Sequence, residues 1–151
     1  MVTTTKSERQ GWMSVLARTD FLHLKNLWEP LNLSPHYQVI RQPEKGLIQV
    51  QSRMGGTGNP FNIGDMTVTR SVIKLPEGEM GYSYIKGRNQ DHALLAALID
   101  ALMQTSTYCA PLMQQVIEPL MATMQEQTQA RREQVATSKV EFFTMVRGED
   151  E

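Results

Sequence analysis

A glycine-rich stretch with arginines nearby is the part of this chain whose residue types could do chemistry. Glycine lacks a Cβ atom, so the N–H groups of neighbouring glycines can turn together toward an anion. Arginine side chains add charge-assisted hydrogen bonds to a phosphate or phosphonate group. We expect the residues of such a ligand-binding site to be Arg53, Gly55, Gly56, Thr57, Gly58, Arg70 and Arg88. The alternative is a hairpin connection whose glycines only supply positive φ angles.

The glycine-rich stretch lacks the standard nucleotide-binding signatures. No Gly-Lys-Ser/Thr follows the glycines, which excludes a Walker loop. A strand pattern follows them rather than a helix, which counts against a dinucleotide-binding βαβ unit. An anion site here would therefore depend on backbone amides and side chains, without a helix N-terminus.

No residue set in the sequence predicts a catalytic or metal centre. His23, His36 and His92 fall in none of the metal-ligand spacings, and His92 is the best candidate for a titrating group. Asp100 has no second carboxylate for acid–base work, and we expect it to contact the partner edge of its helix. Cys109 is the single cysteine and has no histidine or basic cluster nearby to activate it. We therefore expect no catalytic residue, no metal and no cofactor in this chain.

The composition indicates an ordinary globular chain in a reducing compartment. A length of 151 residues suits one domain, and 40% hydrophobic with 21% charged residues is typical of soluble proteins. The net charge of −1 gives no general attraction to nucleic acid or to an anionic membrane. The sequence has no apolar run of about 20 residues, and residues 1–10 lack the apolar region of a signal peptide. We expect a cytoplasmic protein.

The hydrophobic pattern predicts a single α+β domain over residues 1–151. Residues 7–33 read as two short helices, with Ser7 and Asp20 as their N-caps. Residues 36–88 change to a period of two, which predicts an antiparallel β-meander of about four strands. We expect the turns of this meander at residues 43–46 and 76–79.

Side chains should alternate between the two faces of that sheet. Ile48 and Val50 fall on one face of the second predicted strand, and Gln49 and Arg53 fall on the other. We expect the apolar face to meet a core and the polar face to meet solvent or a partner.

Residues 89–138 predict a pair of late helices with a polar extension. Asn89 or Asp91 should cap the first helix, and a linker at residues 108–110 should separate it from a second helix that begins at Pro111. Pro119 must kink or divide the second helix, which becomes polar on all sides from residue 125. Residues 139–148 read as a C-terminal strand that pairs with an edge of its own sheet or of a neighbouring chain. Together with ten methionines, these features indicate an interaction subunit rather than a self-sufficient enzyme.

Several stretches, in order along nearly the whole chain, closely resemble the PhnG subunit family of the bacterial carbon–phosphorus lyase machinery. The matching stretches are Trp12-Met-Ser-Val-Leu-Ala17, Tyr37-Gln-Val-Ile-Arg41, Gly46-Leu-Ile-Gln-Val-Gln-Ser-Arg-Met-Gly-Gly-Thr-Gly58, Gly64-Asp-Met-Thr-Val-Thr-Arg70, Gly81-Tyr-Ser-Tyr84 with Gly87-Arg88, Ala97-Leu-Ile-Asp-Ala-Leu-Met-Gln104 and Val140-Glu-Phe-Phe-Thr-Met-Val-Arg-Gly148.

The resemblance implies a subunit of a transferase complex in phosphonate catabolism. PhnG-like proteins work with PhnH, PhnI and PhnJ subunits and an ATP-binding-cassette-type PhnL protein. The complex transfers a phosphonate such as methylphosphonate to C1 of the ATP ribose and releases adenine, so ATP is a substrate of the complex rather than a cofactor of this chain. The resemblance transfers no catalytic residue to this chain. Two hypotheses follow: a structural subunit, or a direct contributor to phosphate or phosphonate binding through residues 53–58.

Overall fold

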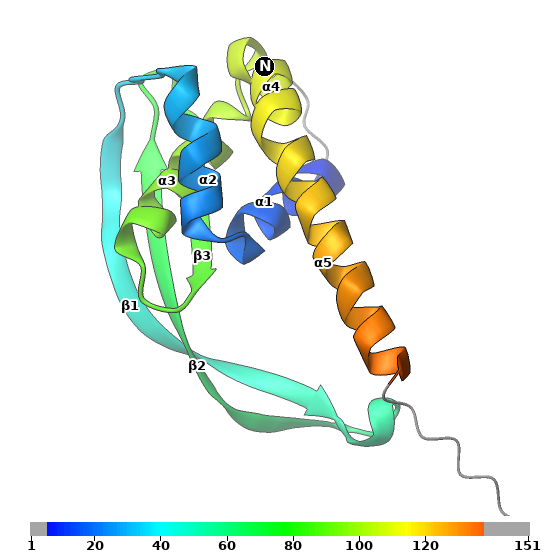
Figure 1. Ribbon diagram of the computed structural model, residues 1–151. Coiled ribbons are helices and arrows are strands. Elements are labelled where there is room, and N and C mark those ends of the chain that lie inside the picture. Colours follow the sequence, from blue (N-terminus) through cyan, green and yellow to red (C-terminus); the bar gives the residue numbers. More distant parts are fainter. Residues whose placement is uncertain (1–5, 138–151) are drawn as a thin grey trace, which may run out of the picture.

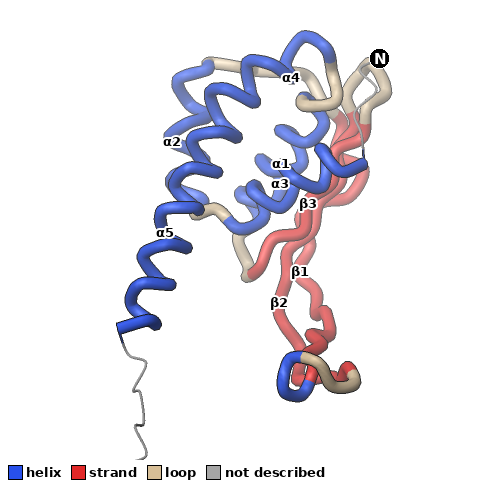
Figure 2. Tube along the Cα trace, turned by 90° about the vertical axis from the view of Figure 1, so that its right-hand side faces the viewer, coloured by secondary structure: helices blue, strands red, loops and turns tan. Residues whose placement is uncertain are grey.

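A three-stranded antiparallel sheet with helices on one face forms the body of the chain in the computed structural model, which describes residues 6–137 (Figure 1). Figure 2 shows the helices as one layer and the sheet as the other. In chain order, the elements are α1 (Lys6–Arg18), α2 (Phe21–Trp28), a 3-10 turn (Glu29–Leu31), β1 (Gln38–Arg53), a 3-10 turn (Met54–Gly56), β2 (Pro60–Lys74), β3 (Met80–Lys86), α3 (Gln90–Leu102), α4 (Ser106–Leu112), a π-helical turn (Met113–Ile117) and α5 (Glu118–Thr137).

The α+β class is confirmed, but the sheet has three described strands rather than four. Residues 43–46, predicted as a turn, continue β1. The ladder pairs Arg41 with Val72 and Glu44 with Arg70, so one extra residue of β1 is absorbed in a bulge. Pro43 suits this bulge because it has no N–H to offer the ladder, and its carbonyl accepts a hydrogen bond of 2.8 Å from the Gln90 side chain. The predicted C-terminal strand at residues 139–148 lies outside the described residues.

β1 and β2 continue beyond the body as a two-stranded arm, which we define as residues 47–67. β3 pairs with residues 68–74 of β2 only, so the pairs from Leu47–Thr67 to Arg53–Pro60 have no third strand. Figures 1 and 2 show the arm extending below the body, and Figure 2 shows its tip apart from the end of α5. The short predicted hairpin is therefore the tip of a long projection.

The core lies between the sheet and α3. Nine of the thirteen residues of α3 are buried, as its apolar stripe predicts. α3 packs directly on the backbone of β3, since a Cβ atom at Gly81 would lie 1.9 Å from the Ala97 carbonyl oxygen. The largest fully buried apolar side chains are Leu16, Leu24, Ile73, Ile99, Leu102, Met103, Leu112, Val116, Ile117 and Leu120.

The helix starts follow their capping residues. The Asp20 carboxylate accepts from the Leu22 amide at 3.0 Å, and the Asn89 side chain accepts from the His92 amide at 2.9 Å, so these two predicted caps are confirmed. The predicted cap Ser7 is wrong, because α1 already includes it. The linker predicted at residues 108–110 is wrong. The helix already begins at Ser106, because the Thr105 hydroxyl caps it at the Tyr108 amide.

The sequence predicts that Pro119 kinks or divides its helix. In the structure, the π-helical turn Met113–Ile117 interrupts the helix just before Pro119. A wider turn relieves the clash of the proline ring with the preceding carbonyls. Beyond it, every residue from Gln125 to Ala136 is exposed, in agreement with the predicted polar extension. By length and hydropathy, no single helix among residues 6–137 could cross a membrane. α3 and the helical run Ser106–Ala136 meet that test only together, and they are bent by 119° at the break between them.

Candidate functional site

The tip of the arm holds the glycine-rich stretch. Gly55 and Gly56 have φ angles of 60° and 82°, which side chains with a Cβ atom disfavour. Gly58 is needed for a different reason, because a Cβ atom there would lie 2.7 Å from the Met54 carbonyl oxygen. The conformation of the turn thus accounts for all three glycines without a ligand.

Hydrogen bonds within the tip use part of its donor capacity. The amides of Thr57 and Gly58 both donate to the Met54 carbonyl oxygen. The Arg53 guanidinium donates to the Gly58 carbonyl at 3.2 Å. An anion at the tip would therefore meet the amides of Gly55 and Gly56 and the remaining donors of Arg53, which is a smaller cradle than the sequence predicts.

The structure does not bring Arg70 to this loop. Arg70 lies opposite Glu44 in the ladder, whereas Arg53 lies opposite Pro60. Glu44 and Arg53 are nine positions apart on β1, which corresponds to roughly 30 Å of extended strand. Arg88 is exposed and follows Gly87, whose amide donates to Thr67 O at the base of the arm.

Arg70 is instead part of a polar cluster on the outer face of the sheet, by which we mean the face away from the helices. Its guanidinium donates to the Glu44 carboxylate at 2.7 Å and to the Tyr84 hydroxyl oxygen at 3.2 Å. These hydrogen bonds, first with Tyr84 and then with Glu44, raise the pKa of Arg70. The Glu44 carboxylate offsets the positive charge, so Arg70 is poorly placed as a free anion receptor.

The rest of the outer face above the arm is apolar and aromatic. The register places Tyr82 beside Val72 and Tyr84 beside Arg70, with Ile40 at the bulge of β1. Tyr82, Tyr84 and Ile40 are 42–50% exposed and line a shallow groove of about 330 Å³. Large exposed residues of this kind typically mark a surface that another molecule covers.

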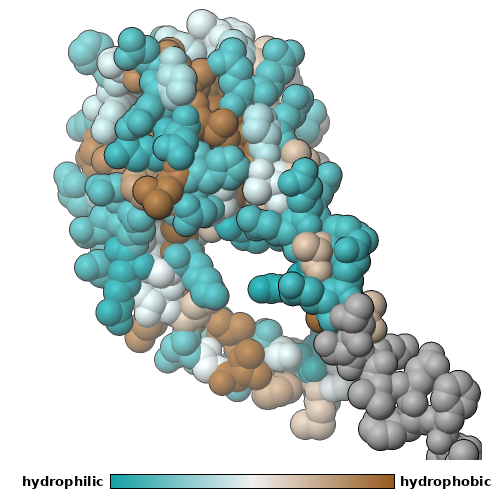
Figure 3. Space-filling model, in the orientation of Figure 1, coloured by the Kyte–Doolittle hydropathy of each residue, from teal (hydrophilic) through white to brown (hydrophobic). Residues whose placement is uncertain are grey.

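An apolar stripe continues this outer face along the arm. Thr69 and Ser71 are buried toward the helices, so the residues of β1 that share their face also point toward the helices. Ile48 and Val50 occupy the alternate positions of β1 and therefore point outward. The register places Met66 opposite Ile48 and Phe61 opposite Ser52 on the same side. Apolar side chains are exposed on the arm also in the view of Figure 3, and Leu47, Phe61 and Ile63 are 69%, 44% and 58% exposed. The prediction that Ile48 and Val50 meet a core of this chain is therefore wrong.

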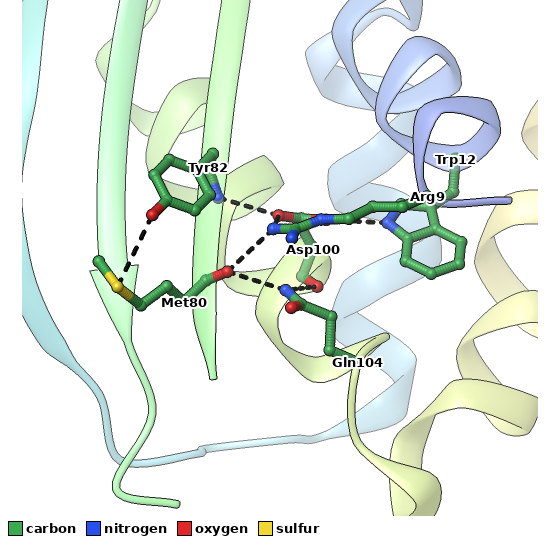
Figure 4. Close-up of polar contacts among 6 residues, drawn as sticks. All are labelled: Arg9, Trp12, Met80, Tyr82, Asp100 and Gln104. Carbon is green, nitrogen blue, oxygen red and sulfur yellow. Dashed lines mark hydrogen bonds and ion pairs between the residues drawn. The ribbon is translucent and has the colours of Figure 1, made fainter. Parts of the chain in front are cut away.

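A buried carboxylate connects α1, β3 and α3 (Figure 4). The Asp100 side chain accepts from the Arg9 guanidinium at 2.7 and 3.2 Å, from Trp12 Nε1 at 2.9 Å and from the Tyr82 amide at 2.9 Å. Arg9 and the Gln104 amide group also donate to the Met80 carbonyl, and Arg9 lies 5.6 Å from the Tyr82 ring centre. All of the carboxylate's capacity is used within the fold, so Asp100 is a structural hub rather than a free acid or base.

The sequence located Asp100 but not its partners. Arg9 is 91 residues away, and no local pattern connects the two side chains. For the aromatic outer face, by contrast, the sequence does contain a signal. Tyr82 and Tyr84 alternate in β3, which puts both rings on one exposed face.

His92 is a buried packing residue rather than an exposed acid–base group. Its Nε2 lies 2.9 Å from the Leu16 carbonyl oxygen, which fits a neutral ring with its proton on Nε2. Burial lowers the pKa of His92, while the hydrogen bond to Leu16 and the charge of Asp20 oppose that shift. Among residues 6–137, no group of three or more histidine, cysteine, aspartate and glutamate side chains is arranged to hold a metal ion.

Comparison with known proteins gives consistent matches over nearly the whole chain. Residues 7–148 match the family described as "Phosphonate metabolism protein PhnG". A relative from Rhizobium meliloti (strain 1021) is named "Alpha-D-ribose 1-methylphosphonate 5-triphosphate synthase subunit PhnG". It is 36% identical over 144 residues, which cover 95% of this chain and 92% of the relative.

Proposed function

Because this chain belongs to the PhnG family of phosphonate metabolism proteins, we propose that it is a non-self-sufficient subunit of a cytoplasmic carbon–phosphorus lyase complex. The complex joins a phosphonate oxygen, such as that of methylphosphonate, to C1 of the ATP ribose. The glycosidic bond to adenine breaks and adenine leaves. The product is the α-D-ribose 1-methylphosphonate 5-triphosphate that appears in the relative's name. PhnI-, PhnH- and PhnJ-type chains and a PhnL-type ATP-binding-cassette protein are the proposed partners.

The outward apolar stripe of the arm is the observation that carries this proposal. By the register, Ile48, Val50, Met66 and Phe61 share one face of the arm; Phe61 is 44% exposed and the other three are half-buried. Burying a fully exposed side chain of this size contributes about 1.5–3 kcal/mol, and covering these partly exposed side chains contributes about half of that. An isolated chain leaves that free energy unused, whereas a docked subunit gains it. We propose that a PhnI-type chain lies on this stripe and on the adjoining outer face.

Substitutions in the stripe test the docking surface. Phe61→Ser and Ile48→Ser should each weaken association with a co-expressed PhnI-type partner by roughly 3- to 12-fold, which corresponds to about half of the 1.5–3 kcal/mol above. The control is Leu22→Ser on α2, where leucine is 66% exposed but lies on the helical layer. Pull-down yields and isothermal titration measure binding, and circular dichroism reports whether each variant is folded. Equal binding by all three variants would contradict the proposal.

The second candidate function is a direct contact of the arm tip with triphosphate or phosphonate. The exposed guanidinium of Arg53 and the amides of Gly55 and Gly56 support it. In the assembled complex, Arg53→Ala should raise the KM for ATP or phosphonate while the subunits still co-purify, and Arg53→Lys should lose less. An unchanged KM in both variants would eliminate this candidate and leave the docking proposal intact.

A further inference from the structure

The outer face of the sheet, above the arm, carries an excess of positive charge. By the register, its rows contain four cationic side chains and one carboxylate, namely Arg41, Arg70, Lys74 and Lys86 against Glu44. These rows therefore have a formal charge of +3, whereas the whole chain has a net charge of −1. A local field of this sign attracts the anionic groups of another molecule.

The one carboxylate of these rows does not neutralise their cations. Glu44 Oε1 lies 2.7 Å from Arg70 Nε and 3.6 Å from Arg41 Nη1, so two guanidinium groups share a single oxygen. Lys74 and Lys86 are exposed, and within residues 6–137 neither of them forms an ion pair. Covering unpaired cations is costly unless opposite charge comes with the cover. A molecule that lies on this face must therefore supply anionic groups.

The cations are spread around an aromatic centre rather than gathered at one point. Lys74 pairs with Met80 at one end of β3, and Lys86 lies six positions further along that strand, which corresponds to roughly 20 Å. The register places Tyr82 and Tyr84 between these ends, beside the groove of about 330 Å³. A small anion such as phosphate meets only one of the two lysines, whereas a protein surface meets both and also fills the groove.

The arm continues the same face as an apolar surface. Ile48 and Phe61 belong to its outward stripe, which offers no cation to a phosphate chain. A nucleic acid on the outer face would leave this stripe uncovered, but a protein with both acidic and apolar residues fits the two parts together. Tyrosine and arginine are also enriched at the energetic centres of protein interfaces.

We propose that the outer face binds an acidic surface of a partner protein, whose carboxylates pair with Arg41, Lys74 and Lys86. An apolar side chain of the same surface lies in the groove beside Tyr82 and Tyr84. This inference rests on the proposed function, and it adds the chemistry that the docked partner presents to the sheet.

Carbodiimide cross-linking of the co-expressed complex tests these contacts. The reagent joins a lysine amine to a carboxylate as an amide and takes up the released water as a urea, so only touching groups react. The full-length chain with its PhnI-type partner should give peptides that join Lys74 or Lys86 to an aspartate or glutamate of the partner, as identified by mass spectrometry. In the variant with Lys74→Arg and Lys86→Arg, these peptides should disappear while the affinity stays within about twofold, because arginine keeps the charge but does not react.

Charge reversal measures how much the same contacts contribute to binding. Lys74→Glu combined with Lys86→Glu should weaken association by about 10-fold or more at low salt, and by less at about 0.5 M sodium chloride, where screening is strong. The matched control is Arg131→Glu combined with Arg132→Glu, which changes the net charge equally on the exposed end of α5. Isothermal titration measures binding, and circular dichroism reports whether each variant is folded.

The outcomes separate this inference from the proposed function. Cross-links from either lysine to partner carboxylates, with a loss of affinity confined to the lysine reversal, support it. It is overturned if the lysines cross-link to nothing or only to another copy of this chain, if both reversals weaken association equally, or if polyuridylate RNA displaces the partner. A complex that depends on Phe61 but not on the lysines overturns this inference alone, whereas a wild-type chain that never joins the partner overturns both.

Discussion

Replacing Asp100 with alanine should destabilise this chain strongly, because its carboxylate holds together three elements. The carboxylate is fully buried and accepts from Arg9, Trp12 and the Tyr82 amide at 2.7–3.2 Å. Alanine leaves the Trp12 and Tyr82 donors buried without an acceptor and Arg9 without its ion-pair partner. Arg9 is partly protected from this loss, since its side chain is 30% exposed and also bonds the Met80 carbonyl.

Asp100→Ala should lower the free energy of unfolding by about 4 kcal/mol. This figure combines about 1–3 kcal/mol for each hydrogen-bond donor left without an acceptor with the cost of the broken buried ion pair. For a chain of this size, that corresponds to a fall of about 8–16 °C in the thermal midpoint. Arg9→Met should cost about 2 kcal/mol, and the double variant should cost at least about 1 kcal/mol less than the sum of the single variants. Urea unfolding followed by circular dichroism measures all three.

Two results would refute this reasoning. One is an Asp100→Ala variant within about 1 kcal/mol of the wild type. The other is additivity of Arg9→Met and Asp100→Ala within about 0.5 kcal/mol, since residues in one network must couple. Trp12→Phe serves as a graded control, because it removes one donor and retains most of the aromatic packing.

Two further predictions concern other buried contacts. The free energy of unfolding should fall as the pH drops below about 6.5 toward the lower folded-state pKa of His92. The reason is that the unfolded chain then binds a proton at His92, whereas the buried ring of the folded chain resists it. In His92→Gln, thermal melting at different pH values should lack this pH-dependent loss of stability. Gly81→Ala should cost about 3 kcal/mol because its Cβ atom would collide with Ala97, whereas Gly11→Ala, with no atom within 4 Å of the new Cβ, should stabilise α1 by about 0.5–1 kcal/mol in the same melting assay.

Local chemistry predicted the parts of this fold that depend on neighbouring residues. Asp20 and Asn89 cap their helices as expected, because a cap needs only its own first turn. The prediction of a turn at residues 43–46 was wrong for the converse reason. Their turn chemistry is sound locally, but the pairs on either side continue the ladder with β2, and the accumulated pairing outweighs one turn.

The candidate site depended on long-range geometry that a single sequence does not contain. Alternation correctly separated Ile48 and Val50 from Gln49 and Arg53, yet it could not say which face the helices cover. Likewise, the sequence could not separate Arg70 from the loop, because its distance from Arg53 follows from the length of the arm. The register of one long hairpin therefore decides how most of the predicted site residues are placed.

Association between this chain and a PhnI-type partner is the most direct test of the central claim. Size-exclusion chromatography of the co-expressed pair should give one stoichiometric complex with the wild-type chain. With Ile48→Ser and Phe61→Ser combined, the two proteins should elute separately while the circular dichroism spectrum of this chain is unchanged. A complex that persists in the folded double variant, or a wild-type chain that never joins the partner, would contradict the account.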